Sequence, residues 1–504
     1  KLVTVKMLPF DNKSELQIIV DAPEGTPLEA TLAAAREMAD RVVSLPGVRD
    51  IQVYAGLSAP FNFNGLVRHY FMRRGANVAD LQVNLLPKGE RGASSHTVAQ
   101  RVRPVVLEVA HRLGVRVKVA EIPPGPPVLS TLVAEVYASD PEARKEIAAR
   151  VLNIFEHTDG VVDADWYVEA AQPKLRFVID REKAALAGVD PEQVAMTLRL
   201  AVDGASPGVA HPGEEREPVP ILVRLPRAER TSLESLRDIR LLSASGTTVP
   251  VSEVTRLERT TTAPFLYRKN GRPVTYVVGD VAGTEESPVY AMLKMSEPVR
   301  AIATAGGPAV EERLVDDPAR ADHAGVVWDG EWRITYEVFR DLGIAFAAVL
   351  VLIYILVVAW FRSFLVPLLI MAPIPLTLIG ILPGHALGGI FFTATSMIGM
   401  IALAGIIVRN SILLVDFIQL SLERGLTLEE AVLEAGAVRF RPIALTAAAI
   451  IVGATVMILD PIFQGLAVSL MAGVFASTAL TLVVIPLLYY VVMRRRVPNE
   501  RSGR

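Results

Sequence analysis

Cysteine is absent from this chain of 504 residues. Its absence excludes disulfide bonds, thiolate nucleophiles and cysteine-ligated metal sites. An excess of positive charge is also absent, because 51 Lys and Arg residues are balanced by 54 Asp and Glu residues, which leaves a net charge of -3. We therefore expect no nucleic-acid partner, since a surface that binds nucleic acid carries a marked basic excess.

Motifs for several kinds of chemistry are missing as well. The sequence contains no Gly-rich phosphate loop of the Walker type, no nucleophile elbow and no Ser/His/Asp signature, which argues against an ATPase or a hydrolase. The seven His residues are scattered, and the 12 Met residues show no paired arrangement of the kind that binds soft metals. We therefore predict no enzymatic activity, no cofactor and no metal site.

Hydrophobic residues make up 51% of the chain and are concentrated in its last third. The mean hydropathy of +0.38 is too high for a soluble enzyme, so part of the chain is expected to lie in a bilayer. Five nearly uncharged segments are long enough to cross ~30 Å of hydrocarbon: residues 341–361, 364–383, 391–419, 442–459 and 466–493. Residues 1–340 are instead rich in Pro, Gly and charge and are predicted to form a polar globular region.

The connections between the predicted spans carry positive charge at one end of the spans only. The residues concerned are Arg362, Arg424, Arg439, Arg441 and the run from Arg494 to Arg496. The connections around His385 and at residues 460–464 carry no Lys or Arg. By the positive-inside rule the charged end faces the cytoplasm, which places residues 1–340 on the outer side of the membrane.

An exported region of this size needs a signal or a membrane anchor before it. The sequence begins at Lys1 with no apolar segment of that kind. We therefore expect the chain to be one half of a longer protein, starting just after a missing sixth span. A cleaved signal peptide is the alternative.

The region before the spans repeats a strand, helix, strand pattern. Its helices are predicted near 27–44, 141–157 and 191–202. The first is expected to start with a capping box formed by Thr26 and Glu29, and the other two with an Asp followed by a Pro. Similar strands flank the first two helices, which predicts two copies of one α/β unit separated by a Pro-rich spacer at 123–127. Two unrelated α+β domains are the alternative.

Arg409 lies near the middle of the third predicted span. A charge at that depth is costly, so it requires a partner. Asp416 is two turns further along roughly the same face, ~10 Å away along the axis, so it joins a polar stripe with Arg409 without pairing with it directly. No predicted span offers a carboxylate at matching depth, so the partner is expected on a segment outside this chain. A structural water cluster or backbone carbonyls are the alternative partners.

Three weaker sequence features concern the packing and polarity of the predicted spans. Thr446, on the fourth span, could hydrogen-bond across to the polar stripe of Arg409, although helical Thr more often bonds to its own backbone. Gly380 and Gly384 have the spacing of a close helix contact. A short amphipathic helix over residues 427–437 is predicted to lie along the inner leaflet.

Aromatic residues gather in a stretch of the globular region that also contains Gly and Asn. Phe61 and Phe63 are predicted to lie on a loop, followed by Tyr70 and Phe71. Exposed phenylalanines on a loop suit the capture of apolar ligands. Packing onto a core is the equally weighted alternative.

Several of these stretches together resemble one known family. The segment from Gly405 to Phe417, containing Arg409, Asn410 and Asp416, and the segment from Val438 to Thr446 resemble late membrane helices of resistance-nodulation-division (RND) efflux permeases. The segments 179–204 and 246–251 resemble the same family. The resemblance covers essentially the whole chain as the C-terminal half of a permease of the acriflavin-resistance type, which exports hydrophobic or amphiphilic compounds.

The resemblance implies a homotrimeric, proton-driven pump in the bacterial inner membrane, working with a periplasmic adaptor and an outer-membrane channel. Arg409 falls at the position of a basic relay residue and Thr446 at that of a relay threonine, and Asn410 and Asp416 are predicted to belong to the same proton relay. The acidic pair that accepts the proton belongs to the N-terminal half. Phe61 and Phe63 resemble phenylalanines of a switch loop beside the substrate pocket. Export of heavy-metal cations is one alternative, and a membrane scaffold or secretion-assisting subunit without transport activity is another.

The predicted fold class is an α+β porter and docking region of repeated βαβ units, followed by an all-α bundle of five transmembrane helices. The predicted boundaries are a first porter subdomain at 1–125, a second porter subdomain at 126–183 and 261–340 interrupted by a docking segment at 184–260, a transmembrane bundle at 341–496 and a cytoplasmic tail at 497–504.

Overall fold

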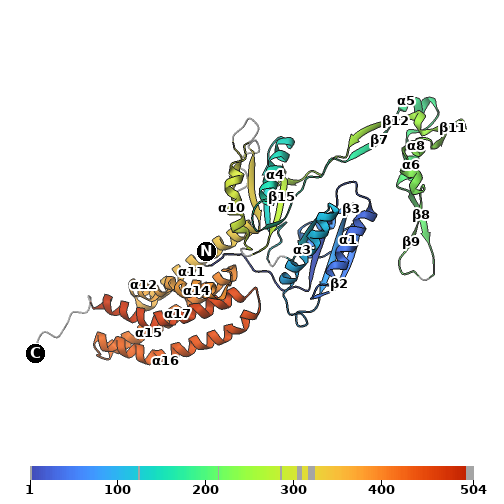
Figure 1. Cartoon of the computed structure of the whole chain (residues 1–504). Helices are drawn as coiled ribbons and strands as arrows, with labels where there is room; N and C mark the ends of the chain where they lie inside the picture. The colour runs from blue at the N-terminus through green and yellow to red at the C-terminus, as the bar shows by residue number, and fades with distance from the viewer. Residues whose placement is uncertain are drawn as a thin grey trace, which may run out of the picture. The chain divides into compact units, whose positions relative to one another are not determined.

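The computed structural model describes residues 3–122, 125–213, 215–283, 286–303, 309–315 and 324–494 (Figure 1). It divides into two compact units. One comprises Lys1–Val168 together with Leu266–Arg504, and the other is Glu169–Phe265. The predicted tail at 497–504 and part of the predicted Pro-rich spacer lie outside the described residues.

The first α/β domain, residues 15–120, is a four-stranded antiparallel sheet covered on one face by two helices. Its elements are β1 (Glu15–Asp21), α1 (Leu28–Val42), β2 (Val48–Leu57), β3 (Arg74–Leu85), α3 (Ser95–Leu113) and β4 (Arg116–Ala120). The strands lie in the order β2-β3-β1-β4. Alternate residues of β1, namely Leu16, Ile18 and Val20, are buried in the core with the helices, as the period of two predicts.

The second α/β domain, residues 132–166 and 275–330, repeats this topology. Its elements are β5 (Leu132–Tyr137), α4 (Pro141–Glu156), β6 (Val161–Trp166), β15 (Thr275–Val281), α10 (Pro288–Arg300), β16 (Glu311–Arg313) and β17 (Gly325–Gly330). The order β6-β15-β5-β17 matches that of the first domain, and β16 is added parallel to β17 at the edge. The predicted duplication of one α/β unit is thereby confirmed.

The helix starts agree with the predictions at two of three positions. Asp140 accepts a hydrogen bond from the backbone N–H of Ala143 at 2.7 Å, and Asp190 accepts one from Glu192 at 2.9 Å. The predicted capping box at Thr26 is wrong. Its hydroxyl donates to the Pro23 carbonyl at 2.6 Å, within the preceding turn, and the helix begins one residue later with Pro27 as its N-cap.

The unit Glu169–Phe265 is inserted between β6 and β15 of the second domain. Its elements are β7 (Pro173–Ile179), α5 (Arg181–Leu186), α6 (Pro191–Val202), β8 (Ala205–Ala210), β9 (Val219–Val223), α7 (Arg227–Arg230), α8 (Leu233–Arg237), β10 (Arg240–Leu242), β11 (Thr248–Pro250), α9 (Val251–Val254) and β12 (Thr255–Thr261). Strand β7 pairs with β12. The insertion therefore begins before residue 184, the predicted start of the docking segment.

The last third forms five apolar spans, as predicted. They are α11 (Glu331–Phe361), the run α12 (Val366–Met371), α13 (Pro373–Leu376) and α14 (Leu378–Gly388), then α15 (Ala394–Glu423), α16 (Leu428–Thr455) with η2 (Val456–Leu459), and α17 (Gln464–Met493). Helix α17 contacts α14, α15 and α16. A Cβ on Gly380 would lie 2.5 Å from the carbonyl oxygen of Ala472 in α17, which confirms the predicted close helix contact.

Two predictions about the spans are wrong in detail. Residues 427–437 do not form a separate helix, because α16 runs without a break from Leu428 through Pro442 to Thr455. Helix-forming residues on both sides of Pro442 keep α16 continuous. Arg439, in this helix, stacks on the ring of Phe417 in α15 at 5.1 Å from its centre. His385, predicted in a connection, is buried within α14.

The second α/β domain is continuous with the first span. Strand β17 ends at Gly330 and α11 begins at Glu331, with no loop between them. Residues preceding the first domain also reach the spans, since Val5 forms a parallel bridge with Phe392, just before α15. These two connections join the globular part of the chain to the start of α11 and to the residue just before α15.

Candidate functional site

One face of α15 is uncovered along the length of the helix. Its exposed residues recur at intervals of three and four, the spacing of a single helical stripe: Ile398, Ala402, Gly405, Arg409, Leu413, Asp416 and Leu420. We call this set the α15 stripe. A Cβ on Gly405 would meet no atom within 4 Å, so the stripe offers a thin surface that another helix could approach closely.

Arg409 is exposed at the centre of the α15 stripe. Among the residues that the structure describes, the guanidinium has no hydrogen bond and no ion pair. Holding an unpaired arginine at mid-span costs roughly 2.5 to 3.5 kcal/mol on insertion scales. The geometry therefore favours a polar partner that covers this face.

The other predicted relay residues occupy different surroundings. Asp416 is exposed on the same stripe, whereas Asn410 is buried on the adjoining side of α15. The hydroxyl of Thr446 donates to the carbonyl of Pro442 at 2.9 Å, within its own helix. The predicted hydrogen bond from Thr446 to the stripe is therefore not formed here, because the carbonyl four residues back is the nearer acceptor.

The aromatic stretch of the first domain connects β2 to β3. It contains the short helix α2 (Phe63–Val67), whose N-cap Asn62 accepts from the Gly65 N–H at 2.7 Å, and the 3-10 turn η1 (Tyr70–Met72). Phe61 is 75% exposed and Phe63 39% exposed. Tyr70 is buried against Ile19. Phe61 and Phe63 are therefore available to contact a ligand, whereas Tyr70 packs in the core.

Beneath this stretch lies a small cavity of about 10 Å³, whose lining includes the polar side chains of Gln17, Asn62, Asn64 and Gln82 beside Phe63. The side-chain amide of Gln17 and the Oδ1 of Asn64 have no hydrogen-bond partner there. This volume fits one water molecule, which would satisfy them.

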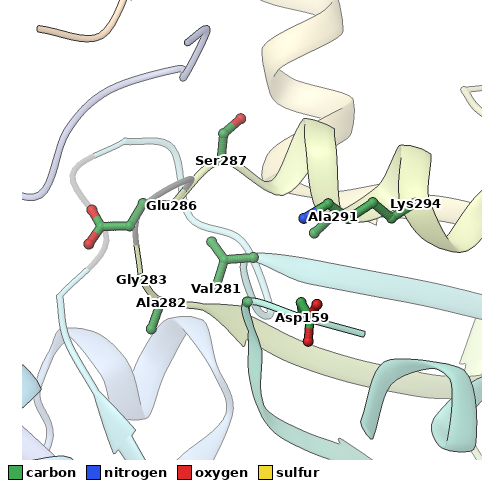
Figure 2. Close-up of a pocket in the computed structure, with 9 residues that line it drawn as sticks. Asp159, Val281, Ala282, Gly283, Glu286, Ser287, Ala291 and Lys294 are labelled. Carbon is green, nitrogen blue, oxygen red and sulfur yellow. The ribbon is translucent and has the colours of Figure 1, made fainter. Parts of the chain in front are cut away.

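A larger cavity of about 330 Å³ lies in the second domain, between the start of β6 and α10. Figure 2 shows Asp159 and Lys294 on one side of it and Glu286 turned to the other. Glu286 is engaged outside the cavity, because its Oε1 lies 2.7 Å from Nε2 of His96. No predicted site residue lines this cavity.

Two buried polar residues, Lys6 before the first domain and His385 in α14, were not predicted as site residues. Lys6 is 2% exposed, with Nζ 3.9 Å from Glu286 and 4.2 Å from the centre of the Phe10 ring. Burial lowers the pKa of Lys6. His385 lies between the carbonyl of Ile381 and the hydroxyl of Ser396, each at 2.9 Å. For His385, the only signal in the sequence was a single His within an apolar run.

Comparison with known proteins assigns the family. Residues 2–493 match the profile of the AcrB/AcrD/AcrF family. The chain belongs to that family. This confirms the resemblance to RND permeases.

Among curated relatives, the chain is 27% identical over 370 residues to the swarming motility protein SwrC of Bacillus subtilis, covering 72% of this chain and 33% of SwrC. It is 27% identical over 378 residues to the cobalt-zinc-cadmium resistance protein CzcA of Cupriavidus metallidurans, covering 73% and 34% respectively. It is 23% identical over 445 residues to the nickel and cobalt resistance protein CnrA of the same organism, covering 84% and 39%. The chain spans about a third of the length of these relatives.

The fold is that of a solved heavy metal efflux pump. The TM-score is 0.78 at 20% identity, and the match covers 98% of this chain and 48% of the pump. At that identity the likeness establishes the architecture alone. The predicted fold class, α/β domains of repeated units followed by five membrane helices, is confirmed.

Proposed function

We propose that this AcrB/AcrD/AcrF-family chain forms half of a proton-driven efflux transporter in a bacterial inner membrane, with residues 1–340 in the periplasm. Its cargo in this proposal is a heavy-metal cation. The complete transporter would comprise a second membrane half, assemble as a homotrimer and work with a periplasmic adaptor and an outer-membrane channel.

The observation that carries the proposal is the unpaired Arg409 on the uncovered α15 stripe. A second membrane half that packed on the stripe with a carboxylate would neutralise the charge. Beside Arg409 the pKa of that carboxylate would be lowered, and it would rise when the two groups moved apart. Protons arriving from one side and leaving to the other could thereby drive the separation of the helices.

The choice of cargo rests on the relatives. CzcA and CnrA are named for resistance to metal cations, and a heavy metal efflux pump shares the fold. This favours the metal-exporting alternative over the export of hydrophobic compounds that the sequence resemblance implied. Within the described residues no three His, Asp or Glu side chains gather into a metal-binding group, so a cation would pass along smaller sets of ligands.

Export of amphiphilic compounds is the second candidate, and one observation favours it. Phe61 is 75% exposed, with its ring centre 5.5 Å from that of Phe71. An exposed aromatic ring that packs on a half-buried one, on a short segment, suits an apolar ligand better than a hydrated cation.

The test is export by the complete transporter in a host that lacks its own metal and drug exporters. We expect protection against Zn²⁺, Co²⁺ or Cd²⁺ and none against detergents or dyes. Replacing Arg409 with Ala should abolish protection, whereas Arg409→Lys should retain part of it because the positive charge remains. Arg424→Ala, at the end of α15, is the matched control and should have little effect.

Each alternative has its own outcome. Protection against amphiphiles alone, lost on replacing Phe61 with Ala, would assign the second cargo. Full proton-coupled export by the Arg409→Ala variant would reject the proposed role of Arg409 in proton coupling. Absence of any export, with Arg409 buried in a dry apolar contact, would favour the scaffold role.

A further inference from the structure

The segment that leads from the inserted unit back into the second α/β domain contains a short hairpin. It consists of β13 (Arg268–Lys269) and β14 (Arg272–Pro273), which pair antiparallel. The two residues of its turn, Asn270 and Gly271, have φ values of 51° and 78°, the left-handed conformations that a two-residue hairpin turn requires. We call residues 268–273 the return hairpin.

Two carboxyl groups lie together on the face of the second sheet that its helices do not cover. On β5, Ala134 and Val136 are in the core with the helices, so the alternation of side chains places Glu135 on the opposite face. On β17, Trp328 is in the same core, which places Asp329 on the opposite face as well. Because β5 and β17 are paired, Glu135 and Asp329 project side by side.

Lys269 of the return hairpin contacts both carboxyl groups. Its Nζ is 2.5 Å from Oε1 of Glu135 and also forms an ion pair with Asp329. The other carboxyl oxygen of Glu135 accepts from the hydroxyl of Tyr137 at 2.8 Å. Glu135 is 1% exposed, whereas the side chains of Lys269 and Asp329 are 25% and 24% exposed. We call Glu135, Asp329 and Lys269 the carboxyl latch.

The carboxyl latch has one more anion than cation when all its groups are ionised. Two carboxylates and one ammonium leave a net charge of −1. The carboxyl groups of Glu135 and Asp329 are also hydrogen-bonded to each other, and such a bond requires a proton on one of them, because an ionised carboxylate only accepts. Burial and the neighbouring Asp329 raise the pKa of Glu135 to about 7, although Lys269 acts to lower it. The pair therefore holds one proton close to neutral pH.

The charged and titratable groups around the latch are engaged elsewhere or neutral. On β15, Tyr276 is aligned with Glu135, and burial together with the charge of Glu135 raises the pKa of Tyr276 to about 12. On β16, Arg313 pairs with Glu311 at 2.7 Å. On β6, Asp165 is paired with cations of the first domain. The remaining titratable neighbours are the tyrosines that pack on Tyr276: Tyr167 and Tyr267. The charge balance of the latch therefore depends on its own three members.

The proton decides how firmly the return hairpin is held. With the hairpin in place the pKa of Glu135 is about 7, and when the hairpin lifts, water reaches the carboxyl group and its pKa falls toward the ordinary 4.5. The closed form therefore binds the proton more tightly than the open form. By linkage, the stabilisation of the closed form is complete below pH 4.5 and is lost as the pH rises through 7.

We propose that Glu135, Asp329 and Lys269 form a proton-binding latch on the second α/β domain. One proton taken from solvent and held between the two carboxyl groups closes the return hairpin onto the sheet, and its return to solvent loosens the hairpin. The latch thereby controls how firmly the connection from the inserted unit is attached to the sheet. It does not depend on the proposed transport function.

Amide hydrogen exchange of the whole chain in lipid nanodiscs tests the latch. The reporters are the amides of the return hairpin and of Val274, whose N–H donates to the carbonyl of Tyr267 at 3.0 Å. Rates at pH 6 and pH 8 are each compared with the intrinsic rate of an unprotected amide at that pH. We expect protection to fall about tenfold from pH 6 to pH 8, the ratio that follows from a pKa of about 7 in the closed form and 4.5 in the open form.

Replacing either carboxyl group with an amide should remove this pH response and leave the hairpin closed. Glu135→Gln imitates the neutral form, and Asp329→Asn leaves one carboxylate for one ammonium. Each variant should show at pH 8 the protection that the parent shows only at pH 6. Lys269→Met removes the cation and should lower protection at both pH values. A purely structural role would instead lower protection in all three variants.

Infrared spectroscopy detects the proton itself and does not require the hairpin to stay closed. The C=O band of protonated carboxyl groups should grow from pH 8 to pH 6 in the parent, and part of this growth should be absent from Glu135→Gln. Arg256→Met is the matched control, because it removes an exposed pair with Glu258 in β12 at 3.0 Å that is outside the latch. This control should leave both measurements unchanged.

The proposal is overturned if the return hairpin of the parent is equally protected at pH 6 and pH 8. It is also overturned if the pH response persists in Glu135→Gln, or if the infrared band of that variant grows as much as the band of the parent. None of these measurements involves export. A latch that behaves as expected in a chain whose complete transporter exports nothing would reject the proposed function and leave the latch established.

Discussion

The imidazole of His96 is held between two carboxylates, with Nδ1 2.8 Å from Glu121 and Nε2 2.7 Å from Glu286. The ring also stacks on Phe10, with centres 4.8 Å apart. Burial acts to lower the pKa of His96, but the hydrogen bonds and charges of the two glutamates outweigh it and raise the pKa to about 9. At neutral pH the protein therefore holds this histidine in its charged form.

A pH dependence follows at this residue. The pKa rises from 6.5 in the unfolded chain to about 9 in the folded one, so the stabilisation is complete below 6.5 and is lost as pH rises through 9. The unfolding temperature of the parent should exceed that of His96→Gln most at pH 6, and the gap should close by about pH 10. Scanning fluorimetry over this range measures it, and a gap that stays constant with pH would contradict the assignment.

At the scale of elements, the junction of β17 and α11 depends on a glycine. Gly330 has a φ of 74°, and a Cβ on it would lie 2.7 Å from the carbonyl oxygen of Ser130 and 2.9 Å from that of Thr131. Both contacts are with backbone atoms of the segment that leads into β5. Backbone atoms cannot rotate out of the way as a flexible side chain can. Only glycine lets the strand pass directly into the first span.

Gly330→Ala is therefore expected to destabilise the second domain by about 2–4 kcal/mol, the range for steric conflict combined with unfavourable backbone geometry. Unfolding followed by the fluorescence of Trp328 and Trp332 measures the loss. Gly114→Ala is the control, because its φ is 65° with no atom within 4 Å of a Cβ, and it should cost only about 1 kcal/mol. Equal losses in the two variants would show that the close contact is relieved at no cost.

At the scale of the whole molecule, an entire unit is inserted into one connection of the second domain. In the first domain the corresponding connection, between β2 and β3, holds the short segment with Phe61. The ends of the insertion are held together, since the rings of Tyr167 and Tyr267 have centres 5.3 Å apart. A unit attached at two neighbouring points is typically dispensable for the fold of its host.

Replacing Glu169–Phe265 with a short glycine linker should therefore leave the unfolding temperature of the remaining chain within about 3 °C of the parent, a shift of roughly 1 kcal/mol. Scanning fluorimetry measures it. A deletion of residues 161–281, which also removes β6 and β15, is the comparison and should unfold the second domain. Loss of cooperative unfolding in the shorter deletion would show that the insertion supports its host.

Much of the architecture could be predicted because its causes are local. Long apolar runs specify the five spans, Asp-Pro pairs specify two helix starts, and the alternation of β1 specifies its buried face. The continuity of α16 could not be predicted in this way, because Leu428 to Ala437 is amphipathic by itself and joins the following apolar run only in the folded bundle. The prediction of a capping box at Thr26 was wrong for a similar reason, because the Thr26 hydroxyl donates to a carbonyl of the preceding turn.

The sequence by itself determined the membrane spans, the duplicated α/β unit, the family resemblance and the isolated arginine at position 409, because each depends on residues close together in the chain. Only the tertiary structure decided that Arg409 shares an uncovered stripe with Asp416, that His385 is buried, and that cations and anions from distant segments form ion pairs. Such pairs have no local signature, since the strands and helices that bring Arg68 to Asp280 are separated by more than two hundred residues.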